Sequence, residues 1–244
     1  MRITLLHPAT RSHRKTRRSG RGPGPGHLGL GYLAACLLQR GHMVRVLDAK
    51  NDVVTDDVLR RHLLEFQPEI FGVTAMTREV HAAAEACTIV KRVSPDIWTV
   101  IGGPHTSALP ERTLEEFSSV DITVAGEGEI TITELAEAKA SGAVPSELEN
   151  ILDIAFRVGD RVFRTGKRPW LKNLDDLPFP AWELFPKVSR GSCPVGVARS
   201  AAYSAKNRSE DKCDFAALTT FWPNSMRSRN EANARSGFRM TRLA

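Results

Sequence analysis

Residues 1–142 alternate between short apolar runs and longer segments in which apolar residues recur at helical spacing. The apolar runs are Ile3–His7, Val44–Asp48, Ile70–Thr74, Ile97–Ile101 and Asp121–Ala125. The segments with helical spacing are Leu28–Arg40, Thr55–Phe66, Thr77–Val93, Pro110–Phe117 and Ile130–Lys139. Strands that alternate with helices in this way form a parallel sheet covered by helices on both faces. The pattern therefore predicts an α/β fold with a doubly wound, five-stranded parallel sheet.

The pattern changes in residues 143–186. Ile154–Val158 and Arg161–Arg164 flank the dipeptide Gly159-Asp160, which predicts a β-hairpin with a two-residue turn. Leu174–Trp182 contains Pro178 and Pro180 and predicts an extended linker. Residues 187–244 are rich in Ser, Arg and Asn and lack sustained periodicity, so we expect a disordered tail.

The positive charge of the chain is concentrated in this tail. Residues 187–244 carry 11 of the 34 Lys and Arg residues but only 4 of the 28 Asp and Glu residues. Because the remainder is close to neutral, the basic charge does not predict nucleic-acid binding. No apolar run approaches the roughly 18 residues that a membrane span needs, and the N-terminus lacks the apolar core of a secretory signal. We therefore expect a cytoplasmic protein without a membrane span.

Two of the predicted strands run directly into glycine-rich loops. One loop is Gly102-Gly103-Pro104-His105, and the other is Gly126-Glu127-Gly128-Glu129. Glycines at the carboxyl edge of a parallel sheet let the backbone approach a bulky ligand closely. The Gly-x-Gly-x-x-Gly fingerprint is missing after the first strand, which argues against a dinucleotide site. No His, Cys, Asp and Glu residues have metal-ligand spacing, so no protein ligand to a metal is predicted.

Two other parts of the chain carry charged residues but do not by themselves predict a ligand site. Glu129 falls in the first turn of a predicted helix, where a carboxylate complements the helix dipole. The polar segment from His7 to Gly31 is rich in arginine and is either a flap over a ligand or a solvated surface loop.

Several short motifs follow one another in a particular order. They are Leu28–Ala35, Gly41-His42, Gly72–Thr77, Gly102–His105, Gly126–Glu129 and Leu177–Ala181. In this order and spacing, residues 1–186 resemble the N-terminal half of the cobalamin-binding radical S-adenosylmethionine (SAM) enzymes. The resemblance implies a flavodoxin-like B12-binding domain over residues 1–142, with the hairpin and linker leading toward a missing radical SAM domain. The cofactor-binding residues that it implies are Thr74, Met76, Gly102, Gly103, Pro104, His105, Gly126, Glu127 and Gly128.

The chain departs from related families after its first strand. Residues 7–13 read His-Pro-Ala-Thr-Arg-Ser-His and lack the Asp-x-His-x-x-Gly motif whose histidine binds cobalt in corrinoid mutases. The resemblance therefore implies base-off cobalamin without a protein histidine ligand, and His13 is the alternative ligand.

A second departure lies in the tail. Complete relatives hold a [4Fe–4S] cluster and SAM through a Cys-x-x-x-Cys-x-x-Cys motif. In this chain Cys193 is followed by no cysteine before Cys213, so neither the cluster nor SAM is supported. We interpret the change of composition after residue 186 as a truncation or a frameshift.

The resemblance implies that this protein binds cobalamin as the remnant N-terminal domain of a B12-dependent radical SAM methyltransferase or cyclase-like enzyme. Because the cluster motif is absent, we expect no autonomous catalysis. One alternative is a corrinoid carrier subunit that serves a separate catalytic partner. The other is a flavodoxin-fold interaction module with a vestigial pocket.

Overall fold

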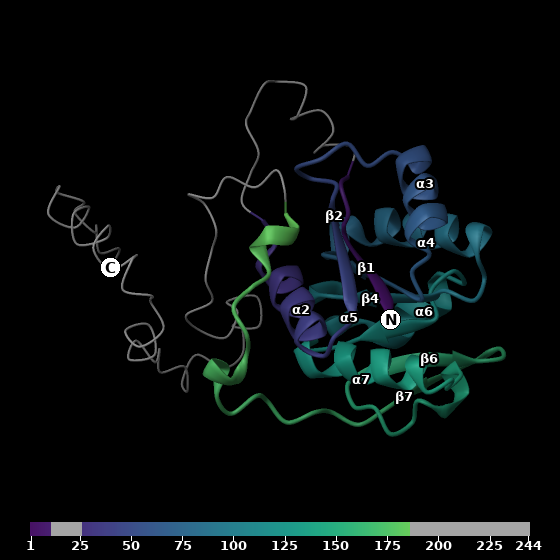
Figure 1. The fold of residues 1–244 in the computed structure, drawn as a ribbon. Coiled ribbons are helices and arrows are strands. Elements are labelled where there is room, and N and C mark those ends of the chain that lie inside the picture. Colours follow the sequence, from purple (N-terminus) through teal and green to yellow (C-terminus); the bar gives the residue numbers. More distant parts are fainter. Residues whose placement is uncertain (11–25, 186–244) are drawn as a thin grey trace, which may run out of the picture. The chain divides into compact units, whose positions relative to one another are not determined.

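The computed structural model describes residues 1–10 and 26–185, which form one seven-stranded sheet with helices on both faces (Figure 1). The order of the strands is β2-β1-β3-β4-β5-β6-β7. The parallel strands are β1 (Arg2–His7), β2 (Met43–Asp48), β3 (Ile70–Thr74), β4 (Trp98–Gly102) and β5 (Ile122–Val124). The hairpin strands β6 (Ile154–Val158) and β7 (Arg161–Arg164) add to β5 in antiparallel fashion. The predicted α/β fold, with five parallel strands followed by a hairpin, is confirmed.

Several sequence predictions fall outside the described residues. They concern the basic part of the loop after β1, His13, Cys193, Cys213 and the tail 187–244.

The helices follow the local signals of the sequence closely. They are α2 (Leu28–Gln39), α3 (Asp56–Phe66), α4 (Val80–Val93), α5 (Pro104–Ala108), α6 (Pro110–Glu116) and α7 (Glu129–Ala140). Thr55 caps α3 through its hydroxyl oxygen, which accepts a hydrogen bond from the Val58 N–H group at 3.3 Å. A 3₁₀ turn at Thr77–Glu79 precedes α4. The short helix α5 was not predicted, because five residues are too few to show a helical period.

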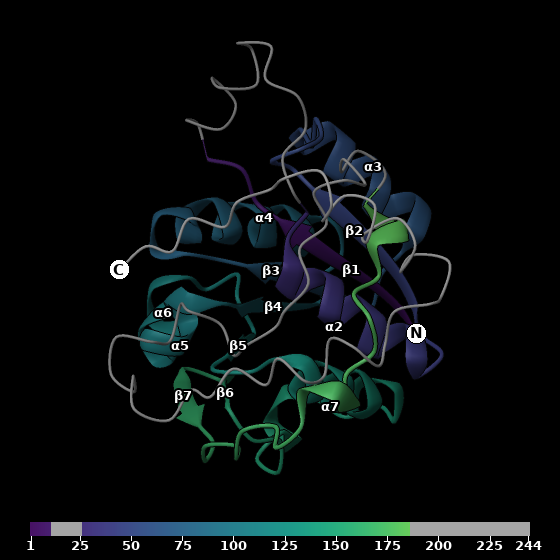
Figure 2. The same ribbon diagram turned by 90° about the vertical axis from the view of Figure 1, so that its left-hand side faces the viewer.

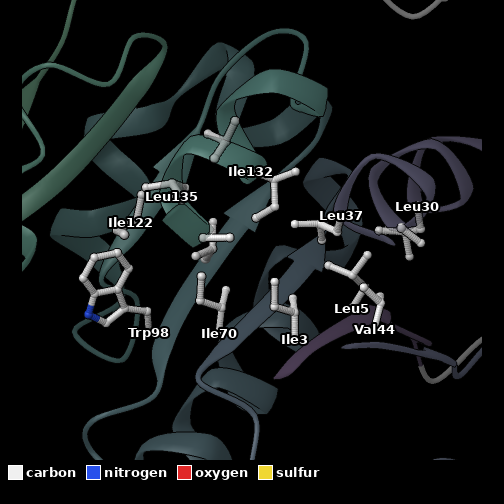
Figure 3. Packing of buried hydrophobic residues seen from close by; sticks show 14 of the residues in the cluster. Ile3, Leu5, Leu30, Leu37, Val44, Ile70, Trp98, Ile122, Ile132 and Leu135 are labelled. Carbon is white, nitrogen blue, oxygen red and sulfur yellow. The ribbon is translucent and has the colours of Figure 1, made fainter. Parts of the chain in front are cut away.

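The helices divide into two layers, one on each face of the sheet. Helices α2 and α7 pack on one face, and α3, α4 and α6 pack on the other. Figure 3 shows Leu37 of α2 and Ile132 and Leu135 of α7 directed toward Ile3 and Ile70 of the sheet. All five side chains are at least 96% buried. Successive side chains along a strand point to opposite faces of the sheet, so each strand contributes residues to both layers in turn.

The predicted linker is a packed part of the domain. We call residues 166–185 the strap; it runs from β7 past α7 to α2 (Figure 2). Arg168 pairs with Glu134 of α7, and the Ala181 N–H group donates to the Gly31 carbonyl oxygen of α2 at 3.0 Å. A Cβ atom at Gly31 would lie 2.9 Å from Pro180 Cβ, so the strap contacts the helix backbone closely. Because α2 is apolar on nearly all sides, it needs this additional cover.

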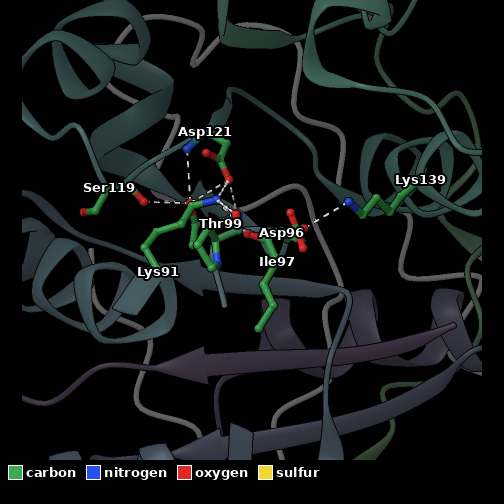
Figure 4. Close-up of polar contacts among 8 residues, drawn as sticks. Lys91, Asp96, Ile97, Thr99, Ser119, Asp121 and Lys139 are labelled. Carbon is green, nitrogen blue, oxygen red and sulfur yellow. Dashed lines mark hydrogen bonds and ion pairs between the residues drawn. The ribbon is translucent and has the colours of Figure 1, made fainter. Parts of the chain in front are cut away.

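A polar network stabilises the amino edge of the sheet, opposite the glycine loops (Figure 4). The Lys91 ammonium group lies 2.6 Å from Asp121 Oδ2 and donates to the Ile97 carbonyl oxygen at 2.8 Å. Asp121 Oδ2 also accepts hydrogen bonds from the Thr99 N–H group at 2.8 Å and the Thr99 hydroxyl at 3.0 Å. These groups satisfy one another, which gives the amino edge a structural role.

Asp121→Asn is expected to lower the free energy of unfolding by about 1 kcal/mol. The amide oxygen still accepts a hydrogen bond, but the charge that pairs with Lys91 is lost. Urea denaturation measures the difference, and the exposed Asp96→Asn is the control with the same change of charge. Equal urea midpoints for the two variants would contradict this prediction.

Candidate functional site

The nine predicted cofactor-binding residues lie together at the carboxyl edge of the sheet. They belong to the ends of three adjacent strands: Thr74 ends β3, Gly102 ends β4, and Gly126 lies two residues beyond β5. Parallel strands that are neighbours in the sheet bring their carboxyl ends to the same edge, where ligands of such folds bind. Contact of these residues with a cofactor remains a prediction.

Hydrogen bonds join the three loops at this edge. The Ala75 N–H group donates to the Gly102 carbonyl oxygen at 2.9 Å, and the His105 N–H group donates to the Ala75 carbonyl oxygen at 3.1 Å. The Gly126 N–H group donates to the hydroxyl oxygen of Ser107 at 3.0 Å. Ser107 was not singled out from the sequence, because it lies in the helix that was not predicted. The loops are thus held in place by their own contacts.

The two glycines at the end of β4 have different reasons to be glycine. Gly103 has φ +105°, and a Cβ atom there would lie 2.9 Å from Thr74 Oγ1 and 3.0 Å from the Ala75 nitrogen. The protein itself therefore requires glycine at position 103. At Gly102 the nearest atom to an added Cβ would be Val124 Cβ, at 3.9 Å. Packing therefore does not require glycine at position 102, because a methyl group there would make only an ordinary van der Waals contact.

Gly102 lies on the face of the sheet that α2 and α7 cover. Side chains two residues apart on a strand share a face of the sheet. Trp98 and Val100, which precede Gly102 on β4, pack in the core beneath α2 and α7. Val124 belongs to the same core cluster. A ligand group over Gly102 would therefore lie between the sheet and these two helices.

The other predicted residues differ in what they contact. Met76 is 47% exposed beside the loops. His105 is buried, its Nδ1 atom lies 3.3 Å from the Thr77 hydroxyl oxygen, and burial lowers the pKa of its imidazole. The Glu127 carboxylate accepts a hydrogen bond from the Leu171 N–H group at 3.0 Å, so it anchors the strap.

A buried polar cluster at the ends of β1 and β2 was not predicted. His7 Nδ1 lies 3.1 Å from Asp48 Oδ1, and the rings of His7 and His27 are 4.6 Å apart. Lys50 pairs with the buried carboxylate of Glu79 at 2.7 Å. Burial, followed by the charges of His7 and Lys50, lowers the pKa of His27 to about 4. Because His7 and Asp48 end adjacent parallel strands in register, the strand pattern contained the signal for this pair.

The described residues include no metal-binding group. Within residues 1–10 and 26–185, no three His, Cys, Asp or Glu side chains are placed to hold a metal ion. Each of three imidazoles at the carboxyl edge forms a hydrogen bond through its Nδ1 atom: His7 with Asp48, His27 with the Leu30 N–H group and His105 with Thr77. No helix of the described ranges is long and apolar enough to cross a membrane.

A known domain family and several known proteins are similar to this chain in sequence. A family model described as the B12 binding domain matches residues 24–136. An uncharacterized methyltransferase of Pyrococcus horikoshii is 33% identical over 199 residues, which are 81% of this chain and 42% of the relative. An anaerobic magnesium-protoporphyrin IX monomethyl ester cyclase of Cereibacter sphaeroides is 28% identical over 192 residues, which are 78% of this chain and 31% of the relative. The chain therefore spans less than half the length of these relatives.

The fold is also similar to that of a solved structure. It is the cobalamin-dependent S-adenosylmethionine radical enzyme OxsB with aqua-cobalamin and S-adenosylmethionine bound. The match has a TM-score of 0.66 and 18% sequence identity, and it covers 83% of this chain and 27% of that chain.

Proposed function

We propose that this chain, whose residues 24–136 match the B12 binding domain model, binds cobalamin at the carboxyl edge of its sheet. The observation that carries this proposal is the lack of a side chain at Gly102, where packing would allow a methyl group, on the face covered by α2 and α7. A broad planar cofactor with an appended tail needs a slot that is free of side chains, and glycine provides one.

The residues around this space fit a large cofactor that is partly apolar. Thr74 and Val124 border Gly102 on the same face, and the exposed Met76 offers apolar surface beside the loop. When bound, cobalamin supplies a cobalt centre for group-transfer chemistry. The contribution of this chain is to bind the cofactor, to orient it by the bonded loops and to exclude water from its buried part.

We further propose that cobalamin binds base-off without a histidine ligand from residues 1–10 or 26–185. This proposal is supported by the sequence that begins at the end of β1, where residues 7–13 lack the Asp-x-His-x-x-Gly motif.

The first experiment mixes the full-length protein with hydroxocobalamin and removes free ligand by gel filtration. We expect about one corrinoid retained per folded chain, with the visible absorption spectrum of the base-off form. A folded protein that retains no corrinoid would overturn the proposal and favour the alternative of an interaction module.

Gly102→Ala is expected to weaken cobalamin binding at least about tenfold while leaving the fold intact. The added methyl group would occupy the space proposed for the ligand but would meet no protein atom closer than 3.9 Å. The control is Gly166→Ala, whose methyl group would also make only an ordinary contact, 3.6 Å from Leu152 Cδ2. Titration of each variant with hydroxocobalamin measures the effect, and equal affinities would count against a slot at Gly102.

We also propose that this chain does not catalyse radical chemistry alone, because its Cys193 and Cys213 cannot supply the three closely spaced thiolates of a cluster. This favours a role in which a separate protein acts on the bound corrinoid. After reconstitution with iron, sulfide and SAM, the protein is expected to form no 5′-deoxyadenosine; detection of that product would contradict the proposal.

A further inference from the structure

The first half of the strap is fixed to α7 and to the glycine loop before it. Arg168 pairs with Glu134 of α7 through two of its nitrogen atoms. Three residues later, the Leu171 N–H group donates to the Glu127 carboxylate at 3.0 Å. Residues 172–176, which follow, are exposed or half-buried. Polar contacts therefore hold this half of the strap, and its middle is open to solvent.

The end of the strap is fixed to α2 by close packing. The Ala181 N–H group donates to the Gly31 carbonyl oxygen at 3.0 Å, and a Cβ atom at Gly31 would lie 2.9 Å from Pro180 Cβ. Ala181 and Phe185 are at least 96% buried. Because glycine weakens a helix interior, contact with the strap, and not the helix, accounts for glycine at position 31. The strap therefore links α2 to α7 (Figure 2).

The two linked helices also meet directly at the carboxyl edge. A Cβ atom at Gly128, just before α7, would lie 3.3 Å from Leu33 Cδ2 of α2. Gly102 lies on the face of the sheet that these helices cover. A ligand that reaches this face is therefore expected to move α2 and α7 apart at this edge. The strap opposes that movement, because it is fixed to both helices.

We propose that the strap is a releasable brace, which holds α2 against α7 and has to loosen before cobalamin enters or leaves its site. This inference rests on the proposed function. Release of the end of the strap breaks the Ala181–Gly31 hydrogen bond and exposes the side chains of Ala181 and Phe185 to water. The closed form therefore predominates, and the open form is a minor state. A change that favours the open form is expected to speed both entry and exit of the ligand.

Cys36 of α2 reports the opening of the two helices without any ligand. It lies three residues after Leu33, on the same side of α2, and it is buried. Burial raises the pKa of its thiol to about 11, so it reacts slowly while the helices are closed. Cys87 of α4 is fully buried in the core on the other face of the sheet and serves as an internal control.

The first test labels the ligand-free, full-length protein with N-ethylmaleimide and distinguishes the cysteines by mass spectrometry of their peptides. Gly31→Ala is expected to raise the labelling rate of Cys36 about tenfold and to leave that of Cys87 unchanged, because the added methyl group displaces the strap. The control is Gly29→Ala in the same helix, whose methyl group would contact the His27 ring and not the strap. It is expected to label like the wild type. An equal rate for Cys36 in the wild type and Gly31→Ala, or an equal increase for both cysteines, would overturn the inference.

A second variant releases the other end of the strap. Arg168→Gln removes the ion pair with Glu134 and is expected to raise the labelling rate of Cys36 about threefold or more. If Gly31→Ala does not fold, this variant decides the test, and an unchanged rate for Cys36 then contradicts the proposal.

The second test measures the rates of binding and release of hydroxocobalamin by stopped-flow absorbance. In Gly31→Ala both rates are expected to rise about tenfold, while the affinity stays within about threefold of the wild type. An unchanged rate of binding would overturn the role of the strap in ligand entry. Failure of the wild type to bind hydroxocobalamin would overturn the proposed function and that role with it, whereas faster labelling of Cys36 in Gly31→Ala would still support the brace.

Discussion

Gly103→Ala is expected to lower the free energy of unfolding by about 3 kcal/mol or more. Gly103 has φ +105° and ψ −172°, a region of the backbone map that is essentially closed to other residues. An added Cβ atom would also lie 2.9–3.0 Å from Thr74 Oγ1 and from the Ala75 nitrogen and oxygen. Because two of these atoms belong to the backbone, a side-chain rotation does not relieve the contact. Urea denaturation followed by circular dichroism measures the loss.

The adjacent Gly102 provides the matched control for this prediction. Gly102→Ala introduces the same methyl group one residue earlier, where the nearest protein atom would be 3.9 Å away. Its free energy of unfolding is expected to stay within about 0.5 kcal/mol of the wild type. If both variants lost equal stability, the argument from the backbone of Gly103 would be wrong.

Acidification is expected to destabilise the protein through His27, by about 2 kcal/mol between pH 7.5 and pH 5. Burial, with the nearby charges of His7 and Lys50, lowers the pKa of His27 to about 4 in the folded protein, against about 6.5 in the unfolded chain. The unfolded chain therefore binds more protons than the folded protein in this window. Stability is full above pH 6.5 and is lost as the pH falls toward 4.

The proton also removes a helix cap. The Nδ1 atom of His27 accepts a hydrogen bond from the Leu30 N–H group at 3.2 Å at the start of α2, and a protonated imidazole has no acceptor for it. His27→Asn keeps a side-chain acceptor at the N-cap and does not titrate. Free energies of unfolding of both proteins at pH 7.5 and pH 5 isolate the contribution of His27 from that of other groups. Identical pH dependence in the two proteins would exclude His27 as its source.

These two predictions concern the same edge of the sheet. Gly103 is required by the fold, whereas packing does not require glycine at position 102. Stability measurements without ligand and affinity measurements with it therefore report on different residues of one site.

The sequence by itself determined the architecture of this protein. Five apolar runs separated by segments of helical spacing are enough to specify a doubly wound parallel sheet, because each period matches the burial of one type of element. The glycine loops after β4 and β5 could be assigned to the carboxyl edge for the same reason. Local features of the sequence agree with this assignment: Thr55 caps α3, and Gly41, which follows α2, has a positive φ in the structure.

Only the tertiary structure decided how individual groups at that edge are used. Gly102 and Gly103 are indistinguishable in sequence, and their roles differ because of the distances to Val124 and Ala75. The sequence predicted a linker where the structure has the strap. Its contacts with α2 join residues 150 positions apart, as in the Ala181–Gly31 hydrogen bond, and local sequence patterns do not show such contacts. The sequence predicted Glu129 as the start of a helix but did not show that one of its carboxyl oxygen atoms is inaccessible to solvent. Local periodicity specifies elements, but burial and hydrogen-bond partners depend on which elements pack together.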